Sequence, residues 1–159
     1  MFKIRKFNED IVNEYDINWQ NILPKFLTIN QNGKVVKFKM GNVMKNADMV
    51  QCTYDCSVWG FPSTLEIDFY FIKVGSKFKI DVDITVGDDM VSEFSIEQPS
   101  SVNVTEYTSH HSKYSPDSVF GFDEQSLTDL ISLFNRFNGF SVKRSDFNFL
   151  DIKDNYKQN

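Results

Sequence analysis

The chain has 159 residues, a formal net charge of −5, 41% hydrophobic residues and 15% aromatic residues. This length and apolar content predict a single globular domain over residues 1–152, followed by a frayed polar tail at 153–159. No apolar run approaches the roughly 20 residues of a membrane-spanning helix, the first ten residues lack the apolar centre of a secretory signal, and two cysteines cannot form a disulfide scaffold. We therefore expect a cytoplasmic protein without a membrane partner.

The first long element expected is a helix from Asp10 to Leu23. One face of this helix carries apolar residues at helical spacing, namely Val12, Tyr15, Trp19 and Leu23. Pro24 marks its end, because proline cannot continue a helix. An aromatic stripe of this kind is typical of a face that packs on the core.

From Gly33 to about Ser109 the apolar period changes to two, which is typical of strands with one buried face. Four segments alternate clearly, at 36–40, 50–58, 65–72 and 78–86, and two alternate more weakly, at 91–97 and 102–107. The segments between them carry turn residues such as Asn32-Gly33, Gly75-Ser76 and Gly87-Asp88. Successive strands with one apolar and one polar face predict an antiparallel meander.

Residues 110–122 are expected to form an irregular connection to a second helix, Asp123–Asn138. Asp123 suits the N-cap and Gly139 the position after the helix end. The apolar stripe of this helix consists of Leu127, Leu130, Ile131, Phe134 and Phe137. The fold class predicted is α+β, with an antiparallel meander sheet of five to seven strands and an N-terminal and a C-terminal helix packed on one face.

The most informative segment is the hairpin around Gly75-Ser76, which matches a two-residue type II′ turn. That turn sets Tyr70 opposite Asp81 and Asp68 opposite Asp83, with the apolar residues all on the other face. The predicted outer face then gathers the candidate partner-binding residues Glu66, Asp68, Tyr70, Asp81 and Asp83. Like charges across a strand pair cost about 0.2–1 kcal/mol of stability, so we expect a positively charged group to offset the repulsion within this cluster.

Three groups could supply that positive charge. Lys37, Lys39 and Lys79 could neutralise the cluster within the protein. A basic protein surface could dock on it, since complementary charge speeds and orients association. A divalent cation could bind among the carboxylate oxygens, which are the ligands that hard ions prefer.

The two cysteines do not predict a metal site or a catalytic thiol. Cys52 and Cys56 lie about 13 Å apart if both are on one strand, too far for one zinc ion or a direct disulfide. His110 and His111 are adjacent and point opposite ways in an extended chain. We interpret the cysteines as buried free thiols. The sequence also lacks the phosphate-binding, nucleophile-elbow and zinc-protease motifs, so we predict no catalytic residues, metal or cofactor.

The charge is unevenly distributed along the chain. Residues 46–142 carry fifteen Asp and Glu against five Lys and Arg. Such an acidic block disfavours direct nucleic-acid binding, which needs clustered basic residues. It favours either a basic partner or a surface whose charge only keeps the protein in solution.

The segment YDINWQNILPKFL, Tyr15 to Leu27, resembles the helix opening of some immunity proteins of contact-dependent growth inhibition. This resemblance implies a cytoplasmic antitoxin that binds a cognate toxin domain and blocks it, and it assigns no catalytic residue. A basic toxin or nuclease domain would suit the acidic face. Two alternatives remain open: a phage or mobile-element inhibitor of a host protein that mimics nucleic acid, and a metal-dependent hydrolase using the acidic face.

Overall fold

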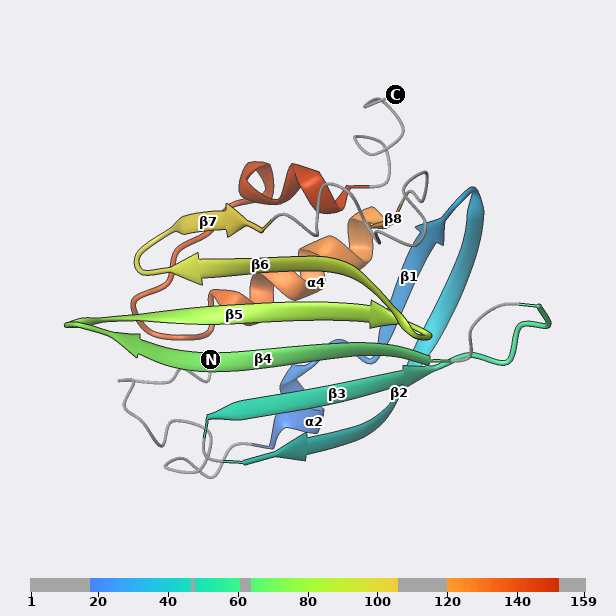
Figure 1. Ribbon diagram of the computed structural model, residues 1–159, viewed down its shortest axis with the longest axis horizontal. Helices are drawn as coiled ribbons and strands as arrows, with labels where there is room; N and C mark the ends of the chain where they lie inside the picture. Colours follow the sequence, from blue (N-terminus) through green and yellow to red (C-terminus); the bar gives the residue numbers. More distant parts are fainter. Residues whose placement is uncertain (1–17, 47, 61–63, 106–119, 152–159) are drawn as a thin grey trace.

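The computed structural model describes residues 18–46, 48–60, 64–105 and 120–151, and Figure 1 shows its arrangement. The strands are β1 (Phe26–Gln31), β2 (Lys34–Lys45), β3 (Met49–Asp55), β4 (Thr64–Val74), β5 (Lys77–Val86), β6 (Asp89–Glu97), β7 (Ser101–Val104) and β8 (Phe120–Phe122). The helices are α2 (Trp19–Ile22), α4 (Glu124–Phe134) and the 3-10 helix η1 (Arg144–Leu150). None of the helices in these ranges is long and apolar enough to cross a membrane.

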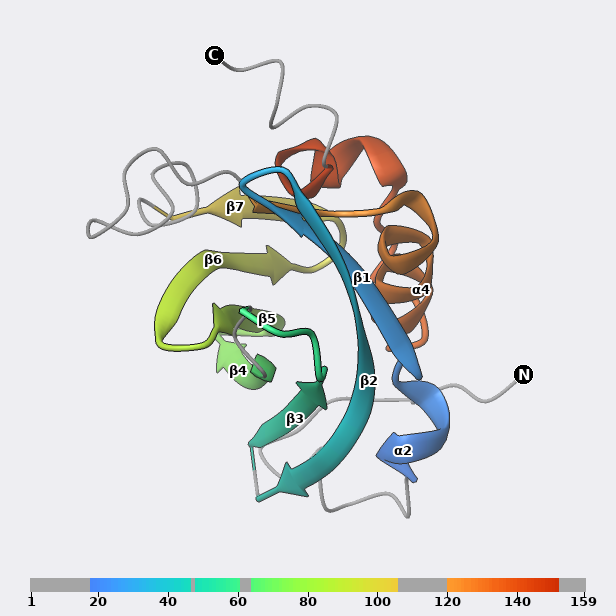
Figure 2. The same cartoon turned by 90° about the vertical axis from the view of Figure 1, so that its right-hand side faces the viewer.

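All eight strands belong to one antiparallel sheet, in the order β7-β6-β5-β4-β3-β2-β1-β8. The pairing of β2 with β3 shifts register between Met40 and Val43, and such a bulge bends a strand. Figure 2 shows the result: the sheet curls into an open half-barrel, and α4 lies along one face of it. The sheet therefore has an inner face toward the helices and an outer face away from them.

The core lies between the inner face and the helices. Phe134 of α4 packs edge-on against Phe69 of β4 and Phe94 of β6, at ring-centroid distances of 6.2 and 6.3 Å. Trp19 of α2 packs against Phe71 and Phe137 at 5.8 and 5.7 Å. The helices and the alternate strand residues thus share one apolar cluster.

Two polar contacts fix the position of α4 against the sheet. The Asp123 carboxylate accepts a 2.9 Å hydrogen bond from the backbone N–H of Ser126, which caps the helix. The Ser126 hydroxyl in turn accepts a 2.8 Å hydrogen bond from the backbone N–H of Thr28 in β1. The first turn of α4 is therefore bonded directly to β1 through the buried Ser126, which also gives the Thr28 N–H its acceptor.

The α+β-like antiparallel meander is confirmed, but the count of five to seven strands is wrong, because the sheet has eight. The alternating segments recover β2 to β7, whereas β1 was not predicted and β8 falls within the expected irregular connection. The three residues of β8 are all buried and so show no alternation. The predicted strand 50–58 ends early, at Asp55.

Both predicted helices are shorter than expected. Asn18 is extended and caps α2 by accepting a 3.2 Å hydrogen bond from the N–H of Gln20, so the helix begins at Trp19 and not at Asp10. Residues 10–17 of that prediction, with Val12 and Tyr15, lie outside the described residues. Pro24 does follow the helix end, and Asp123 is the N-cap of α4. However, α4 ends at Phe134, five residues before Gly139.

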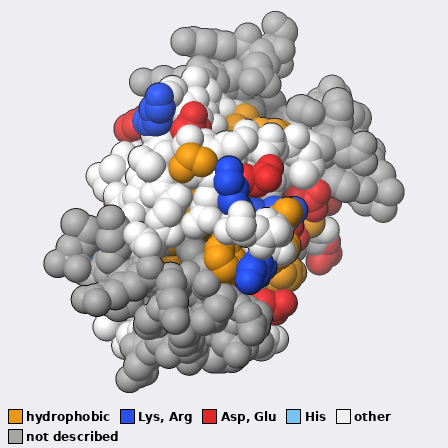
Figure 3. Space-filling view, turned by 90° about the vertical axis from the view of Figure 1, so that its left-hand side faces the viewer, with side chains coloured by type: hydrophobic (Ala, Val, Ile, Leu, Met, Phe, Trp, Pro, Cys, Tyr) orange, Lys and Arg blue, Asp and Glu red, His pale blue; other side chains and the backbone are white. Residues whose placement is uncertain are grey.

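The β4–β5 turn forms one end of the molecule. Gly75 has a φ of +63°, as the first central residue of a type II′ turn requires, so the turn prediction is confirmed. Seen from this end in Figure 3, basic, apolar and acidic side chains lie close together. The residues next to the turn are the exposed Lys77, Val74, which is 49% exposed, and Lys73, whose ammonium lies 5.9 Å from the centre of the Phe78 ring.

Candidate functional site: an acidic groove on the outer face

The predicted register of the β4–β5 hairpin is confirmed in every pair. Tyr70 pairs with Asp81 and Asp68 with Asp83, while Phe69 and Val82 meet on the inner face. The alternation of both strands places the five predicted residues Glu66, Asp68, Tyr70, Asp81 and Asp83 together on the outer face. The sequence therefore predicted this cluster correctly.

The structure adds two residues that sequence reasoning missed. Gln51 of β3 pairs with Asp68, and Glu93 of β6 pairs with Asp83, so three carboxylates follow one another across β4, β5 and β6. The outward position of Glu93 could have been predicted from the sequence, because the inward-pointing Phe94 and Ile96 alternate with it. Its pairing with Asp83 could not have been predicted, because a register shift between Ile84 and Thr85 determines which residue of β6 faces Asp83.

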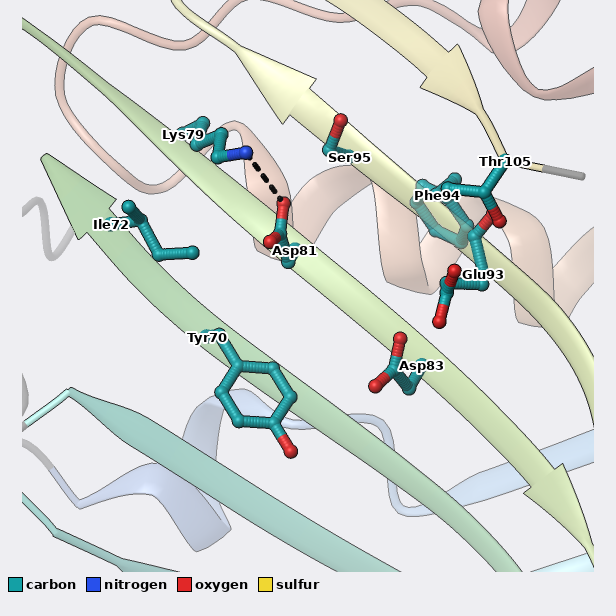
Figure 4. Close-up of a pocket in the computed structure, with 9 residues that line it drawn as sticks. All are labelled: Tyr70, Ile72, Lys79, Asp81, Asp83, Glu93, Phe94, Ser95 and Thr105. Atoms are coloured by element: carbon teal, nitrogen blue, oxygen red, sulfur yellow. Dashed lines mark hydrogen bonds and ion pairs between the residues drawn. The ribbon is translucent and has the colours of Figure 1, made fainter. Parts of the chain in front are cut away.

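Beside this carboxylate row lies a groove of about 440 Å³. Its lining comes from β4, β5, β6 and the residue after β7: Tyr70, Ile72, Lys79, Asp81, Asp83, Glu93, Phe94, Ser95 and Thr105. Figure 4 shows the carboxylates of Asp83 and Glu93 pointing toward one another, with the Tyr70 ring on the neighbouring strand. Acidic and apolar groups thus share one concave surface.

The carboxylates at the centre of the row are hard to ionise. Burial, followed by the neighbouring Glu66 and opposed by Gln51, raises the pKa of Asp68 from 3.8 to about 7. Burial and the adjacent Glu93 raise the pKa of Asp83 from 3.8 to about 6. Oxygen Oδ1 of Asp68 is buried without a hydrogen-bond partner. At neutral pH the row therefore holds partly buried negative charge that the protein itself solvates poorly.

Within the described ranges, one ion pair lies on this face. The Lys79 ammonium is 3.6 Å from Oδ1 of Asp81, which is too long for a hydrogen bond and leaves that oxygen without one. Among the residues that the structure describes, lysine neutralisation, one of the three explanations considered, is therefore seen at the Asp81 end of the groove.

Lys37 and Lys39 do not reach the carboxylate row. Lys39 of β2 pairs with Asp55 of β3, and Asp55 pairs with Thr64 of β4. Lys39 therefore lies two strands from β4 and level with a residue four positions before Asp68, and Lys37 lies further away still. At about 4.8 Å per strand and 3.3 Å per residue, that places them well over 10 Å away. The Lys37 ammonium instead lies 4.4 Å from the centre of the Phe26 ring.

No described group of three or more His, Cys, Asp and Glu residues has the arrangement of a metal site. The inner-face Cys52 is fully buried, and burial raises the pKa of its thiol to about 11, so it is not a reactive thiolate. Cys56 follows the end of β3 and is half-buried, so the expectation that both thiols are buried on the strand is wrong for Cys56. His110 and His111 lie outside the described residues.

No protein-family model matches this chain, and no curated protein or solved structure matches it significantly. What this chain binds must therefore be inferred from the geometry of its own groove.

Proposed function

We propose that this chain is a small acidic binding protein whose groove receives a basic segment of a protein partner. The observation that supports this best is the row Asp68, Asp83 and Glu93, paired in register on adjacent strands beside a concave surface. A guanidinium or ammonium group placed there would bind to oxygens that the protein leaves poorly solvated. It would also relieve the repulsion within the row.

The groove has the mixed character of a protein interface. Tyr70 and Ile72 supply apolar surface, and tyrosine is a common anchor residue in interfaces. The surrounding carboxylates would accelerate encounter with a positively charged partner. The most concrete form of this proposal is a cytoplasmic immunity protein that neutralises a basic toxin or nuclease domain, in line with the resemblance of Tyr15–Leu27.

A co-expression experiment tests the immunity form of the proposal. The toxin candidate is the C-terminal domain encoded by the gene immediately upstream, and the readouts are growth of the co-expressing cells and affinity of the purified pair. The wild-type chain should restore growth and bind with a salt-dependent association rate. The double variant Asp68→Asn/Asp83→Asn should bind at least about tenfold more weakly.

Asp88→Asn/Asp89→Asn provides the matched control, because it also replaces two aspartates, one in the β5–β6 turn and one at the start of β6, both outside the groove lining. This control should retain nearly all of the affinity. If both double variants weaken binding equally, net charge and not the groove attracts the partner. If the toxin candidate does not bind the wild-type chain at all, the immunity form of the proposal is wrong.

A metal titration separates binding from metal-dependent hydrolysis. We expect millimolar Mg²⁺, Mn²⁺ or Ca²⁺ to leave the melting temperature unchanged, because the described carboxylates do not have a metal-site arrangement. A rise that is lost in Asp68→Asn/Asp83→Asn would instead support the hydrolase alternative.

A further inference from the structure

The strongest feature outside the groove is an exposed tryptophan after β3. Trp59 is 96% exposed and the preceding Val58 is 43% exposed, whereas the other tryptophan, Trp19, is 3% exposed. In Figure 1 the described residues after β3, at 56–60, project beyond the ends of β3 and β4. A fully exposed indole on a projecting segment adds nothing to the core, so its position suits contact with something outside the chain.

Lysines from β2 surround this segment. Lys37 and Lys39 line a hollow together with Val58. A Cβ on Gly60 would lie 4.0 Å from the ammonium nitrogen of Lys34. The segment therefore carries its apolar side chains next to basic ones, on the opposite side of β3 from the acidic groove.

Neighbouring side chains of the β1–β2 hairpin extend the apolar part of this surface. Val35 is 63% exposed and Phe26 is 45% exposed, and Lys37 lies over the Phe26 ring. We define the Trp59 patch by the residues Phe26, Lys34, Val35, Lys37, Lys39, Val58 and Trp59.

We propose that the Trp59 patch binds the surface of an anionic lipid bilayer, with Trp59 and Val58 inserted among the headgroups and the β2 lysines above them. Tryptophan partitions to the membrane–water interface because its ring is apolar and its N–H polar. Lysines beside it are attracted by the negative potential of anionic lipids. Such a contact needs no membrane-spanning segment.

The chemistry of the patch favours lipid over single-stranded nucleic acid. Nucleic-acid binding would need stacking surfaces beside an unbroken basic track. Here Asp55 lines the same hollow as Lys37 and Lys39 and interrupts the basic track. The Lys37 ammonium lies over the Phe26 ring, so of the two aromatic rings in the patch only that of Trp59 is open to a base.

Vesicle titration tests the proposal on the full chain. The probes are vesicles of phosphatidylcholine containing phosphatidylserine, vesicles of phosphatidylcholine alone, and an oligothymidylate. Because Trp19 is buried, a change in tryptophan fluorescence reports on Trp59. We expect a blue shift and co-sedimentation with the anionic vesicles only, weakened by added salt. A comparable response to oligothymidylate, or none to anionic vesicles at millimolar lipid, would overturn the proposal.

Variants connect the binding to the patch. Trp59→Ser should abolish the blue shift and the co-sedimentation, and its exposed position should leave folding intact. Lys37→Gln/Lys39→Gln should weaken vesicle binding by about tenfold or more. Lys73→Gln/Lys77→Gln, which removes the same charge on either side of the β4–β5 turn, should have little effect. Equal losses in both lysine pairs, or unchanged binding of Trp59→Ser, would contradict this assignment.

Discussion

At the scale of single residues, Tyr54 connects the middle of the sheet to the chain that enters β1. It lies on the inner face of β3 with no exposed surface, and its hydroxyl donates a 2.7 Å hydrogen bond to the carbonyl oxygen of Pro24. Burial raises the pKa of Tyr54 far above its usual value, so the hydroxyl stays protonated and remains a donor. This bond holds the end of α2 against the sheet.

We expect Tyr54→Phe to reduce the free energy of unfolding by about 1–3 kcal/mol, because it leaves the buried Pro24 carbonyl without its donor. Chemical denaturation measures this loss. Tyr70→Phe is the matched control: its ring lines the open groove, so the change should stay within about 0.5 kcal/mol. Similar losses for the two variants would mean that the Pro24 contact is not what stabilises this region.

At the scale of elements, α4 depends on contacts at its start. The Asp123 cap and the Ser126–Thr28 hydrogen bond fix the first turn of the helix against β1. Asp123→Ala should cost about 1 kcal/mol in thermal or denaturant unfolding, since the Ser126 N–H loses its acceptor. Thr128→Ala, at an exposed position of the same helix, should cost nothing measurable. A loss as large in Thr128→Ala would show general fraying instead of a lost cap.

The elements also show what the sequence could predict. The β4–β5 hairpin was predictable because local alternation and the Gly75-Ser76 turn together determine its register. The length of α2 was not, because Asn18 interrupts an apolar periodicity that continues through it. A bulge determines that Glu93 faces Asp83, and the pairing of β8 with β1 joins segments far apart in the chain. Neither feature produces a local pattern of residues in the sequence from which it could be predicted.

At the scale of the whole molecule, the acidic groove should make stability depend on pH in an unusual direction. The pKa values of Asp68 and Asp83 are about 7 and about 6 in the folded protein, both raised from 3.8. Between about pH 4 and 7 the folded state therefore holds more protons than the unfolded state. Stability contributed by these two groups falls as pH rises through that window.

We expect Asp68→Asn/Asp83→Asn to remove this contribution. Its melting temperature should exceed that of the wild type at pH 8 by about 2–4 °C, the shift expected for about 1 kcal/mol of relieved repulsion. The difference should shrink toward pH 4, where both carboxyls are protonated in the folded wild type and no longer repel their neighbours. A constant difference across this range, with Asp88→Asn/Asp89→Asn as the reference, would show that these carboxyls titrate normally.

The order of the strands in the sheet also bears on how the chain folds. Every ladder joins strands that follow one another along the chain, except the pairing of β1 with β8, which brings Ile29 beside Phe122. Closing a short loop costs less chain entropy than closing one of about ninety residues. During synthesis, β1 to β7 could therefore pair progressively as they emerge from the ribosome, whereas the pairing of β1 with β8 must wait until β8 has been made.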